Sequence, residues 1–493
     1  MVGHRLAGLR EVAGRRGDLG DNAAMRLGPR TTALCLLLLT SCLVDAVPAR
    51  ADGPPPTTIT LTAAPVHADE STTLEVDLTA PDAQAGGQAP VAGAQVEIER
   101  KADGAWTSLG TVVTDEAGHA ELDTTLSRTS GDNVFEATYA GDAVHAPADT
   151  GPVPVALVRR GSRVRLTGPG SVVDEQRLTL QVHWAAGNGT PVPGTVRIYR
   201  RSGSGKWRHD RDVSTDANGD ATFTARPRVD TRWRAQAHRL DWVGGDRSPA
   251  HAVDNLPPGR PVALPARAPR PRVHVPAQPH AKGVGAHVVT TRIPDGVWRQ
   301  MVGRTWHAGC PVGRASLRLV RLNYWDFRGY RHRGELVANA DAAARISGAL
   351  ADMYDHRLPI RSIYREDRFG WSSRVRGADD YRSMAAGNTS VFNCRDVVNR
   401  PGVRSPHAYG RALDLNTWEN PYRSARGTVP DTWWQSHSHP RVAWRSRQHL
   451  VVQIMARHGL RWTYGLGDTQ HFDAPAGNGR YLSRPAHCHG VCE

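Results

Sequence analysis

The segment SPHAYGRALDLN, residues 405–416, determines how the C-terminal part of this chain can fold. Pro406 and Gly410 favour a tight loop around His407, because proline restricts the backbone and glycine permits sharp turns. The residues that follow, 412–415, predict a short strand that carries Asp414. The segment therefore predicts a loop and a strand that together present an imidazole and a carboxylate.

A second segment, GLGDTQHF at residues 465–472, adds another carboxylate and another imidazole. A catalytic zinc ion takes three nitrogen or oxygen ligands from the protein and leaves a fourth position for water. His407, Asp414 and His471 would form such a set. Asp468 lies three residues before His471, close enough to take a proton from that water and deliver it to a leaving amine.

The pattern S-x-H-x-x-G-x-A-x-D followed by D-x-x-H-F resembles the D-alanyl-D-alanine carboxypeptidase and L-alanyl-D-glutamate endopeptidase family of zinc peptidases. The matching positions are Ser405, His407, Gly410, Ala412, Asp414, Asp468, His471 and Phe472. The resemblance implies Zn²⁺ bound by His407, Asp414 and His471, with Asp468 as the catalytic base. The vancomycin-resistance branch has Glu where Asp468 stands, so carboxypeptidase and endopeptidase action both stay open.

The similarity extends over residues 310–472 and looks like an actinobacterial branch of this family. It rests on GELV at 334–337, NTSxFNCR at 388–395 and NPY at 420–422. Arg395 is a candidate for stabilising the oxyanion that forms when water attacks a peptide carbonyl. The alternative is that Arg395 orders the loop near Cys394. We expect Ser405 to fix its loop, since no base is placed to make it a nucleophile.

Two other clusters could compete for metal. His437-Ser438-His439 lies in a polar stretch, and HCHxxC at residues 487–492 holds four possible ligands. Cysteines at 310, 394, 488 and 492 form an even set in a chain that we expect to be exported, which predicts two disulfides. Of the three pairings, we favour Cys310 with Cys394 and Cys488 with Cys492.

The region around these motifs, residues 283–493, predicts an α+β domain. Apolar patterns predict strands at 317–322 and 360–364, and helices at 340–354 and 447–458, the second ending at Gly459.

Residues 57–255 contain a duplication. PVAG at 90–93 and PVPG at 191–194, Trp106 and Trp207, and TDxxGxA at 114–120 and 215–221 all recur at an offset of 101 residues. Alternating patterns at 58–61, 73–78, 94–99 and 195–199 predict strands, so we expect two all-β immunoglobulin-like sandwiches at 57–155 and 156–255. We expect Trp106 and Trp207 to be packed strand residues rather than carbohydrate platforms.

The stretch between the sandwiches and the C-terminal domain, residues 256–282, is rich in Pro and Arg. Such density of proline excludes helix and central strand, and it predicts a semi-rigid extended linker. Its arginines could lie against an anionic wall, or the linker could simply be solvated.

The first 51 residues predict an export signal. A basic flank precedes an apolar run at 31–44, too short to span a bilayer, and Ala49-Arg50-Ala51 follows it. LTSC at 39–42 also resembles a lipoprotein cleavage box, so lipid anchoring through Cys42 stays open beside free secretion. We therefore expect a secreted or wall-associated protein, with no transmembrane span in the mature chain.

The composition, with a net charge of +14, predicts attraction to polyanions. We expect peptidoglycan stem peptides as substrate, anionic wall polymers as possible partners, no nucleic acid, and a monomer. The predicted whole is a multidomain protein with two all-β sandwiches followed by an α+β zinc peptidase. The alternative is a non-catalytic wall-binding protein that grips peptide through a peptidase-like domain.

Overall fold

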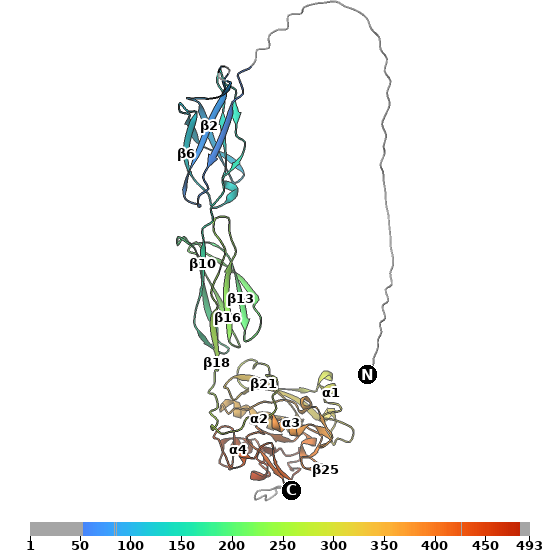
Figure 1. The fold of residues 1–493 in the computed structure, drawn as a ribbon. Helices are drawn as coiled ribbons and strands as arrows, with labels where there is room; N and C mark the ends of the chain where they lie inside the picture. The colour runs from blue at the N-terminus through green and yellow to red at the C-terminus, as the bar shows by residue number, and fades with distance from the viewer. Residues whose placement is uncertain (1–52, 83, 85, 425, 484–493) are drawn as a thin grey trace, which may run out of the picture.

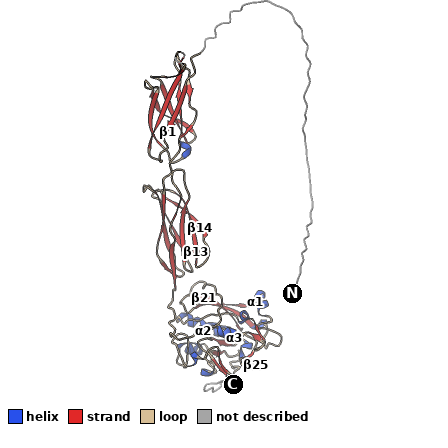
Figure 2. Ribbon diagram, viewed as in Figure 1, coloured by secondary structure: helices blue, strands red, loops and turns tan. Residues whose placement is uncertain are grey.

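The computed structural model describes residues 53–82, 84, 86–424 and 426–483. Two all-β units and a C-terminal unit with both helices and strands follow one another along the chain (Figures 1 and 2). The predicted signal, Cys42, the 487–492 cluster and the Cys488–Cys492 pairing lie outside the described residues. Within those residues, no helix is both long enough and apolar enough to cross a membrane.

The first β unit has two sheets around one apolar core. The core residues include Leu74, Val76, Val96, Ile98 and Phe135, all fully buried. They alternate with exposed residues along each strand, which is why the chain forms two-faced sheets here. The strands are β1 (Thr58–Ala63), β2 (Ser71–Asp82), β3 (Gly87–Pro90), β4 (Gln95–Ala102), β5 (Ala105–Val113), β6 (His119–Thr125), β7 (Val134–Tyr139), β8 (Ala148–Asp149) and β9 (Val153–Pro154).

The second β unit repeats this plan around the buried rings of Trp184 and Trp233. One sheet has the order β10-β12-β15 and the other β11-β18-β16-β13-β14. The strands are β10 (Ser162–Thr167), β11 (Ser171–Val173), β12 (Leu178–Ala186), β13 (Gly194–Ser202), β14 (Arg208–Thr215), β15 (Asp220–Ala225), β16 (Thr231–Ala237), β17 (Asp246–Arg247) and β18 (His251–Leu256).

The repeated TDxxGxA motif forms the same turn in both units. Thr114 Oγ1 donates to the Val91 carbonyl at 2.6 Å, and Thr215 Oγ1 donates to the Val192 carbonyl at 2.7 Å. Gly118 and its counterpart have φ of +73° and +74°, and an added Cβ on either would lie within 2.5 Å of a backbone oxygen. The duplication therefore preserves a turn that only glycine can make.

The C-terminal unit is built on the antiparallel sheet β19-β20-β21. Helix α2 covers this sheet with Ile346, Leu350 and Met353, and helix α4 packs into the same core. The elements are β19 (Val289–Arg292), β20 (Leu317–Trp325), β21 (Arg331–Asn339), α1 (Asp295–Met301), α2 (Ala343–Asp355), α3 (Asp380–Ala385) and α4 (Leu450–Arg457).

Short strand pairs complete this unit and carry the functional residues. They are β22 (Trp371–Ser372) with β23 (Gly377–Ala378), β24 (Asp396–Val397) with β25 (Arg400–Arg404), β26 (Ala412–Asp414) with β29 (His471–Asp473), and β27 (Tyr422–Ser424) with β28 (Gly427–Val429). The predicted strand at 317–322 and both predicted helices are present, with Gly459 after α4 at φ +72°.

The predicted strand at 360–364 is wrong, because its backbone groups bind several separate partners instead of one neighbouring strand. The amides of Arg361 and Tyr364 donate to the side chains of Asn416 and Asn388, each within 2.9 Å. Only one isolated bridge, between Ser362 and Asn388, remains of the strand pairing.

Residues 256–282 form no helix, as the sequence predicts, but much of this extended stretch packs on the C-terminal unit as a strap instead of being simply solvated. The Pro269 carbonyl accepts a hydrogen bond of 2.8 Å from the buried ring of Trp418. Gln278 Oε1 accepts from the Tyr324 hydroxyl at 2.5 Å and the Ile363 amide at 2.8 Å. Proline excludes regular structure here, but it leaves the carbonyl groups free to bind the domain.

Two further predictions concern cysteine and tryptophan. The expected Cys310–Cys394 disulfide is confirmed. Trp106 and Trp207, expected to be packed strand residues, are only half-buried; Trp106 lies in β5 and Trp207 just before β14. Their rings lie outside the cores and are covered by basic side chains, Lys101 over Trp106 and Arg234 over Trp207.

Replacing Gln278 with Ala tests the strap. We expect Gln278→Ala to lower the free energy of unfolding of the C-terminal unit by about 1–3 kcal/mol, because the buried Tyr324 hydroxyl and Ile363 amide lose their acceptor. Urea unfolding of the full chain measures this change. His274→Ala, at an exposed strap position, is the control and should change it by less than about 0.5 kcal/mol. Equal effects of both changes would contradict a strap held by Gln278.

Candidate metal centre

The loop before β26 carries His407 and packs its glycine against the backbone of β21. The 3-10 helix η4 (Pro406–Tyr409) begins at Ser405, whose Oγ accepts from the His407 amide at 3.3 Å. Gly410 follows with φ +68°, and a Cβ there would lie 2.8 Å from the Asn339 amide nitrogen. The loop therefore requires glycine, and Ser405 fixes the loop as the sequence predicts.

Strands β26 and β29 bring the other two residues together. In their antiparallel register Asp414 lies directly opposite His471. Opposite residues on neighbouring strands have their side chains on the same face of the pair. Residues 57 positions apart in the sequence thus reach one small buried site beside His407.

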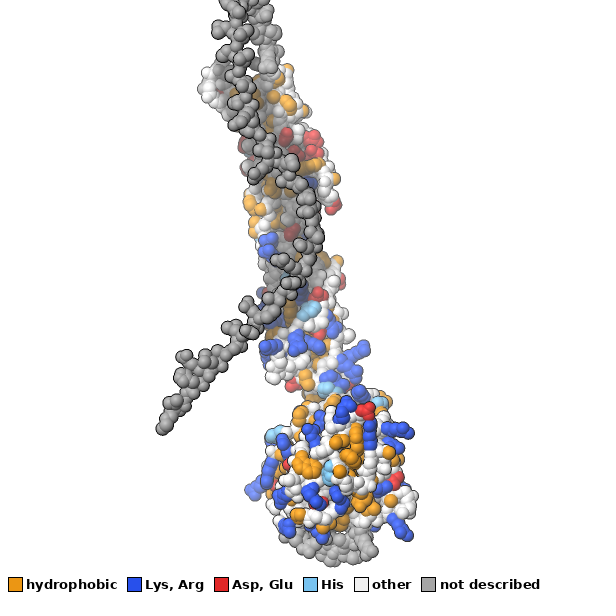
Figure 3. Space-filling model, turned by 90° about the vertical axis from the view of Figure 1, so that its right-hand side faces the viewer, with side chains coloured by type: hydrophobic (Ala, Val, Ile, Leu, Met, Phe, Trp, Pro, Cys, Tyr) orange, Lys and Arg blue, Asp and Glu red, His pale blue; other side chains and the backbone are white. Residues whose placement is uncertain are grey.

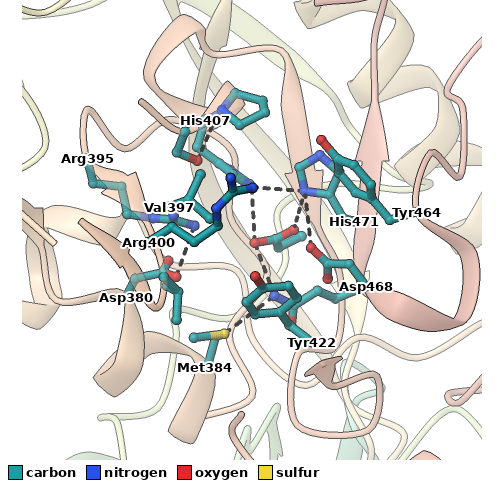
Figure 4. Close-up of a pocket in the computed structure, with 15 residues that line it drawn as sticks. Asp380, Met384, Arg395, Val397, Arg400, His407, Tyr422, Tyr464, Asp468 and His471 are labelled. Carbon is teal, nitrogen blue, oxygen red and sulfur yellow. Dashed lines mark hydrogen bonds and ion pairs between the residues drawn. The ribbon is translucent and has the colours of Figure 1, made fainter. Parts of the chain in front are cut away.

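The three predicted ligands converge at one site, where Figure 4 shows His407 and His471. His407 Nε2 lies 3.1 Å from Asp414 Oδ2, His471 Nδ1 lies 3.1 Å from Asp414 Oδ1, and the two imidazole nitrogens are 3.3 Å apart. Tetrahedral zinc with bonds of about 2.0–2.1 Å separates its ligand atoms by about 3.3 Å. The residues present therefore fit a zinc ion in both donor type and spacing.

The outer nitrogens of both imidazoles are already occupied. His407 Nδ1 donates to the Val391 carbonyl at 2.7 Å, and His471 Nε2 donates to Asp473 Oδ1 at 3.1 Å. With these acceptors a neutral imidazole keeps its proton on the outer nitrogen, and its inner nitrogen is then available to a metal ion. Such outer partners are typical of metal-binding histidines.

The electrostatics of the site also favour a cation. Burial alone would raise the pKa of Asp414, but His407 and His471 outweigh it and hold that pKa below its usual range. Burial alone would lower the pKa of His471, but the carboxylates of Asp473 and Asp414 raise it well above its usual value. This buried group of carboxylates therefore attracts positive charge.

Asp468 lies next to this triad, after the 3-10 helix η6 (Gly465–Gly467). Its Oδ2 is 4.0 Å from His471 Nδ1. This distance is longer than the 3.1–3.3 Å between the three converging residues, so Asp468 is not a fourth member of that set. Its Oδ1 is buried and has no hydrogen-bond partner among the described residues. Burial raises the pKa of Asp468, and the neighbouring Asp414 adds to this effect. The carboxyl group is placed to exchange protons beside the triad.

Arg395 lines the same pocket but is engaged on one side. Its Nη2 lies 2.9 Å from Asp380 Oδ2, and its Nη1 donates to the Asp396 carbonyl at 3.0 Å. Its Nε is buried and without a partner among the described residues. Both suggested roles, oxyanion stabiliser and loop organiser, stay predictions on this geometry.

The rival cluster at His437-Ser438-His439, which lies within the described residues, does not assemble a metal site. His437 stacks on Trp433 with ring centroids 3.6 Å apart, and His439 Nε2 lies 3.3 Å from the Ala263 carbonyl oxygen. His307 does lie beside Cys310 and Cys394. Those two sulfurs are joined in the disulfide and are not thiolate ligands.

Sequence reasoning missed several residues of the site. Asp473 supports His471 from two positions further along β29, where a strand returns to the same face. That spacing is a signal that could have been used. Tyr422 and Tyr464 line the pocket, whose volume is about 100 Å³, and the Tyr464 ring centroid is 5.2 Å from that of His471. Tyr422 falls in the NPY segment that carries part of the resemblance, whereas no local pattern marks Tyr464.

Removing the Asp473 carboxylate tests the metal centre. We expect Asp473→Ala to weaken zinc affinity by about 10–100-fold, because His471 loses the group that orients its ring. Competition with a fluorescent zinc chelator measures the affinity. Asp473→Asn keeps an acceptor oxygen and should lose less. Unchanged affinity in Asp473→Ala would show that Asp473 does not support a metal ligand.

Comparisons with known proteins support this reading of the C-terminal unit. No curated protein matches the chain. Among solved structures, the native conformation of E. coli alpha-2-macroglobulin matches at 11% identity over 58% of this chain and 20% of that one. Its TM-score of 0.19 is too low to indicate a shared fold. The family model described as D-alanyl-D-alanine carboxypeptidase matches residues 399–474, which include all three converging residues and Asp468. The match supports membership of the C-terminal domain in the D-alanyl-D-alanine carboxypeptidase family of peptidases.

Proposed function

We propose that the C-terminal domain is a zinc-dependent peptidase that hydrolyses the stem peptides of peptidoglycan. The observation that carries this proposal is the convergence of His407, Asp414 and His471 at 3.1–3.3 Å, with the Asp468 carboxylate beside them. The family match over residues 399–474 supports the peptidase class.

His407 Nε2, His471 Nδ1 and the Asp414 carboxylate would hold the zinc ion. A zinc ion bound by three protein ligands acts as a Lewis acid and makes water a nucleophile near neutral pH. Val391 and Asp473 would keep the two imidazoles oriented through reaction and product release. The burial of all three ligands keeps competing water away from them.

Asp468 would act as the general base and then as the general acid. Its carboxylate takes a proton from the attacking water and returns it to the nitrogen of the departing amine, so that one group serves both steps. The unpartnered Oδ1 leaves one oxygen available for this exchange. Arg395, whose Nε is also without a partner among the described residues, would place positive charge near the carbonyl oxygen.

The bond that is cut can be terminal or internal. Asp468 stands where the carboxypeptidases of the vancomycin-resistance branch have Glu, which favours the endopeptidase side of the resemblance.

The two β units are proposed to be immunoglobulin-like spacers of an exported, wall-associated protein that keep the peptidase near its substrate. A non-catalytic wall-binding role is disfavoured, because the ligands and Asp468 are both intact.

Replacing Asp468 with Ala tests catalysis apart from metal binding. We expect the zinc-loaded full chain to release peptides from purified peptidoglycan, and Asp468→Ala to lose at least about 100-fold in rate because its proton shuttle is gone. Mass spectrometry of the products identifies the bond. Loss of a terminal D-Ala indicates a carboxypeptidase, and cleavage within the stem or cross-bridge an endopeptidase.

Asp355→Ala, at an exposed helix end, is the matched control and should keep full activity. Zinc content should equal one ion per chain in wild type and in both variants. A folded, zinc-loaded wild type that releases no peptide would refute the peptidase proposal.

Replacing Arg395 with Gln tests the oxyanion role. We expect kcat to fall by about 10²–10³-fold with little change in KM, since the charge acts on the transition state. Arg395→Lys keeps the positive charge and should therefore retain part of the activity. This holds if the ion pair with Asp380 serves only to position the side chain. Folded Arg395→Gln protein with unchanged kcat would assign Arg395 to loop organisation alone.

A further inference from the structure

The two β units have opposite charge although most of their strands pair in the same order. Residues 57–155 contain 3 Lys and Arg against 16 Asp and Glu, whereas residues 156–255 contain 17 against 10. Figure 3 shows Lys and Arg side chains gathered over the second unit and the C-terminal unit. A duplicated fold has therefore diverged mainly in the sign of its surface charge.

The two units can be compared residue by residue on one sheet. Ile98 of β4 is buried opposite Ala137 of β7, and Ile198 of β13 is buried opposite Ala235 of β16. A register shift follows directly after each isoleucine on the side of the next strand. Residues that alternate with these buried positions lie on the outer face of each sheet.

That outer face is acidic in the first unit. Glu97 and Glu99 on β4 and Glu136 on β7 occupy it beside one base, Lys101, and Glu99 lies directly opposite Glu136 in the register. In the second unit the same face carries Arg197, Arg201, Arg232 and Arg234, which we call the basic face.

The basic face brings like charges together. Arg201 lies directly opposite Arg232, an arrangement that lowers the stability of a sheet unless an anion neutralises it. Some arginines elsewhere in this unit are paired, as Arg200 is with Asp210 at 3.0 Å and Arg228 with Asp174 at 2.9 Å. Within the described residues, no arginine of the basic face forms an ion pair.

An aromatic ring arranges two of these arginines. The guanidinium carbons of Arg201 and Arg234 lie 5.4 and 4.4 Å from the centre of the Trp207 ring. The Nε of Arg201 is buried and has no hydrogen-bond partner among the described residues. The ring restricts both side chains while their remaining N–H groups stay available, which suits binding of phosphate or carboxylate. Asp212, opposite Arg197, is bound to His209 at 2.7 Å.

We propose that the basic face of the second β unit binds a linear polyanion with repeating phosphate groups, of the kind attached to a bacterial wall. Guanidinium groups bind phosphate through paired hydrogen bonds, and the bound phosphates remove the repulsion between Arg201 and Arg232. A sheet face is extended and open, which matches a chain-like ligand. The acidic first unit repels the same polymer, so of the two β units only the second engages it.

A second copy of this chain is the other occupant to consider, since its first unit is acidic. Positive charge continues well past the basic face, however. Residues 256–282 contain 5 Lys and Arg and no acidic residue, and residues 283–493 contain 30 Lys and Arg against 17 acidic residues. One acidic β unit covers one sheet face, whereas a long polymer follows the whole basic stretch. The distribution of charge therefore favours the polymer.

The test measures binding of the full chain to linear polyphosphate at several salt concentrations. The variant Arg197→Gln, Arg201→Gln, Arg232→Gln and Arg234→Gln removes the basic face. We expect its affinity to fall at least about tenfold and the slope of log affinity against log salt to shrink by about 3, as four phosphate contacts are lost. The control replaces Arg163, Arg165, Arg177 and Arg239 with Gln, an equal charge change at exposed positions elsewhere on the unit.

A second arm measures sedimentation of each protein with peptidoglycan that keeps its phosphate polymers or has been stripped of them by acid. Wild type should sediment with the first far more than with the second, and the basic-face variant with neither. Equal losses in variant and control would reduce the effect to net charge and overturn the proposal. Loss of self-association in ultracentrifugation, with polyphosphate binding unchanged, would assign the face to a second copy. Hydrolysis of soluble stem peptides should be unchanged in both variants, which separates this proposal from the peptidase proposal.

Discussion

The pairing of β26 with β29 is the constraint on which the candidate metal centre depends. It places Asp414 opposite His471 in a site where both residues are 3% exposed. Buried charges are tolerated only when they are paired or bind a metal. Here two imidazoles and one carboxylate point at one another, while each outer imidazole nitrogen has its own acceptor. The pair of short strands has little core of its own, so the surrounding sheet, helices and loops serve to hold these few residues in register.

Those supports come from distant parts of the chain. The amide of Asn339 at the end of β21 contacts the Gly410 loop, and Val391 reaches His407 from the loop that also crosses Ser390 to Asp414. The disulfide of Cys394 with Cys310 ties the segment before Arg395 to the N-terminal edge of the domain. The strap from residues 256–282 covers Trp418, four residues after Asp414. Rigidity at the site is therefore a property of the whole C-terminal unit.

Patterns with a single period were predictable from the sequence. The strands at 58–61, 73–78, 94–99, 195–199 and 317–322 and both long helices follow two- or 3.6-residue apolar spacing, and all of them are present. The segment 360–364 has the same alternation but satisfies its backbone through Gln278, Asn388 and Asn416. The packing of the strap could not be predicted from the sequence for a related reason. Its prolines exclude regular structure, and nothing local shows that its carbonyl groups bind Trp418 and Tyr364.

The residues of the candidate site also fall into a group that local patterns predict and a group that only tertiary packing brings in. His407, Asp414, Asp468 and His471 lie within two short motifs, so spacing and chemistry were enough to select them. Asp380 and Tyr422 reach the pocket only through tertiary packing, and no local spacing connects them to it. The charge of the β units shows the complementary case. The buried alternation of β4 and β13 fixes the shape of both sheets, while the outward positions are free to change sign. Folding therefore constrains which residues can occupy the buried face of each strand. The outer face is free to be selected for binding, and its charge reflects the ligands of the protein.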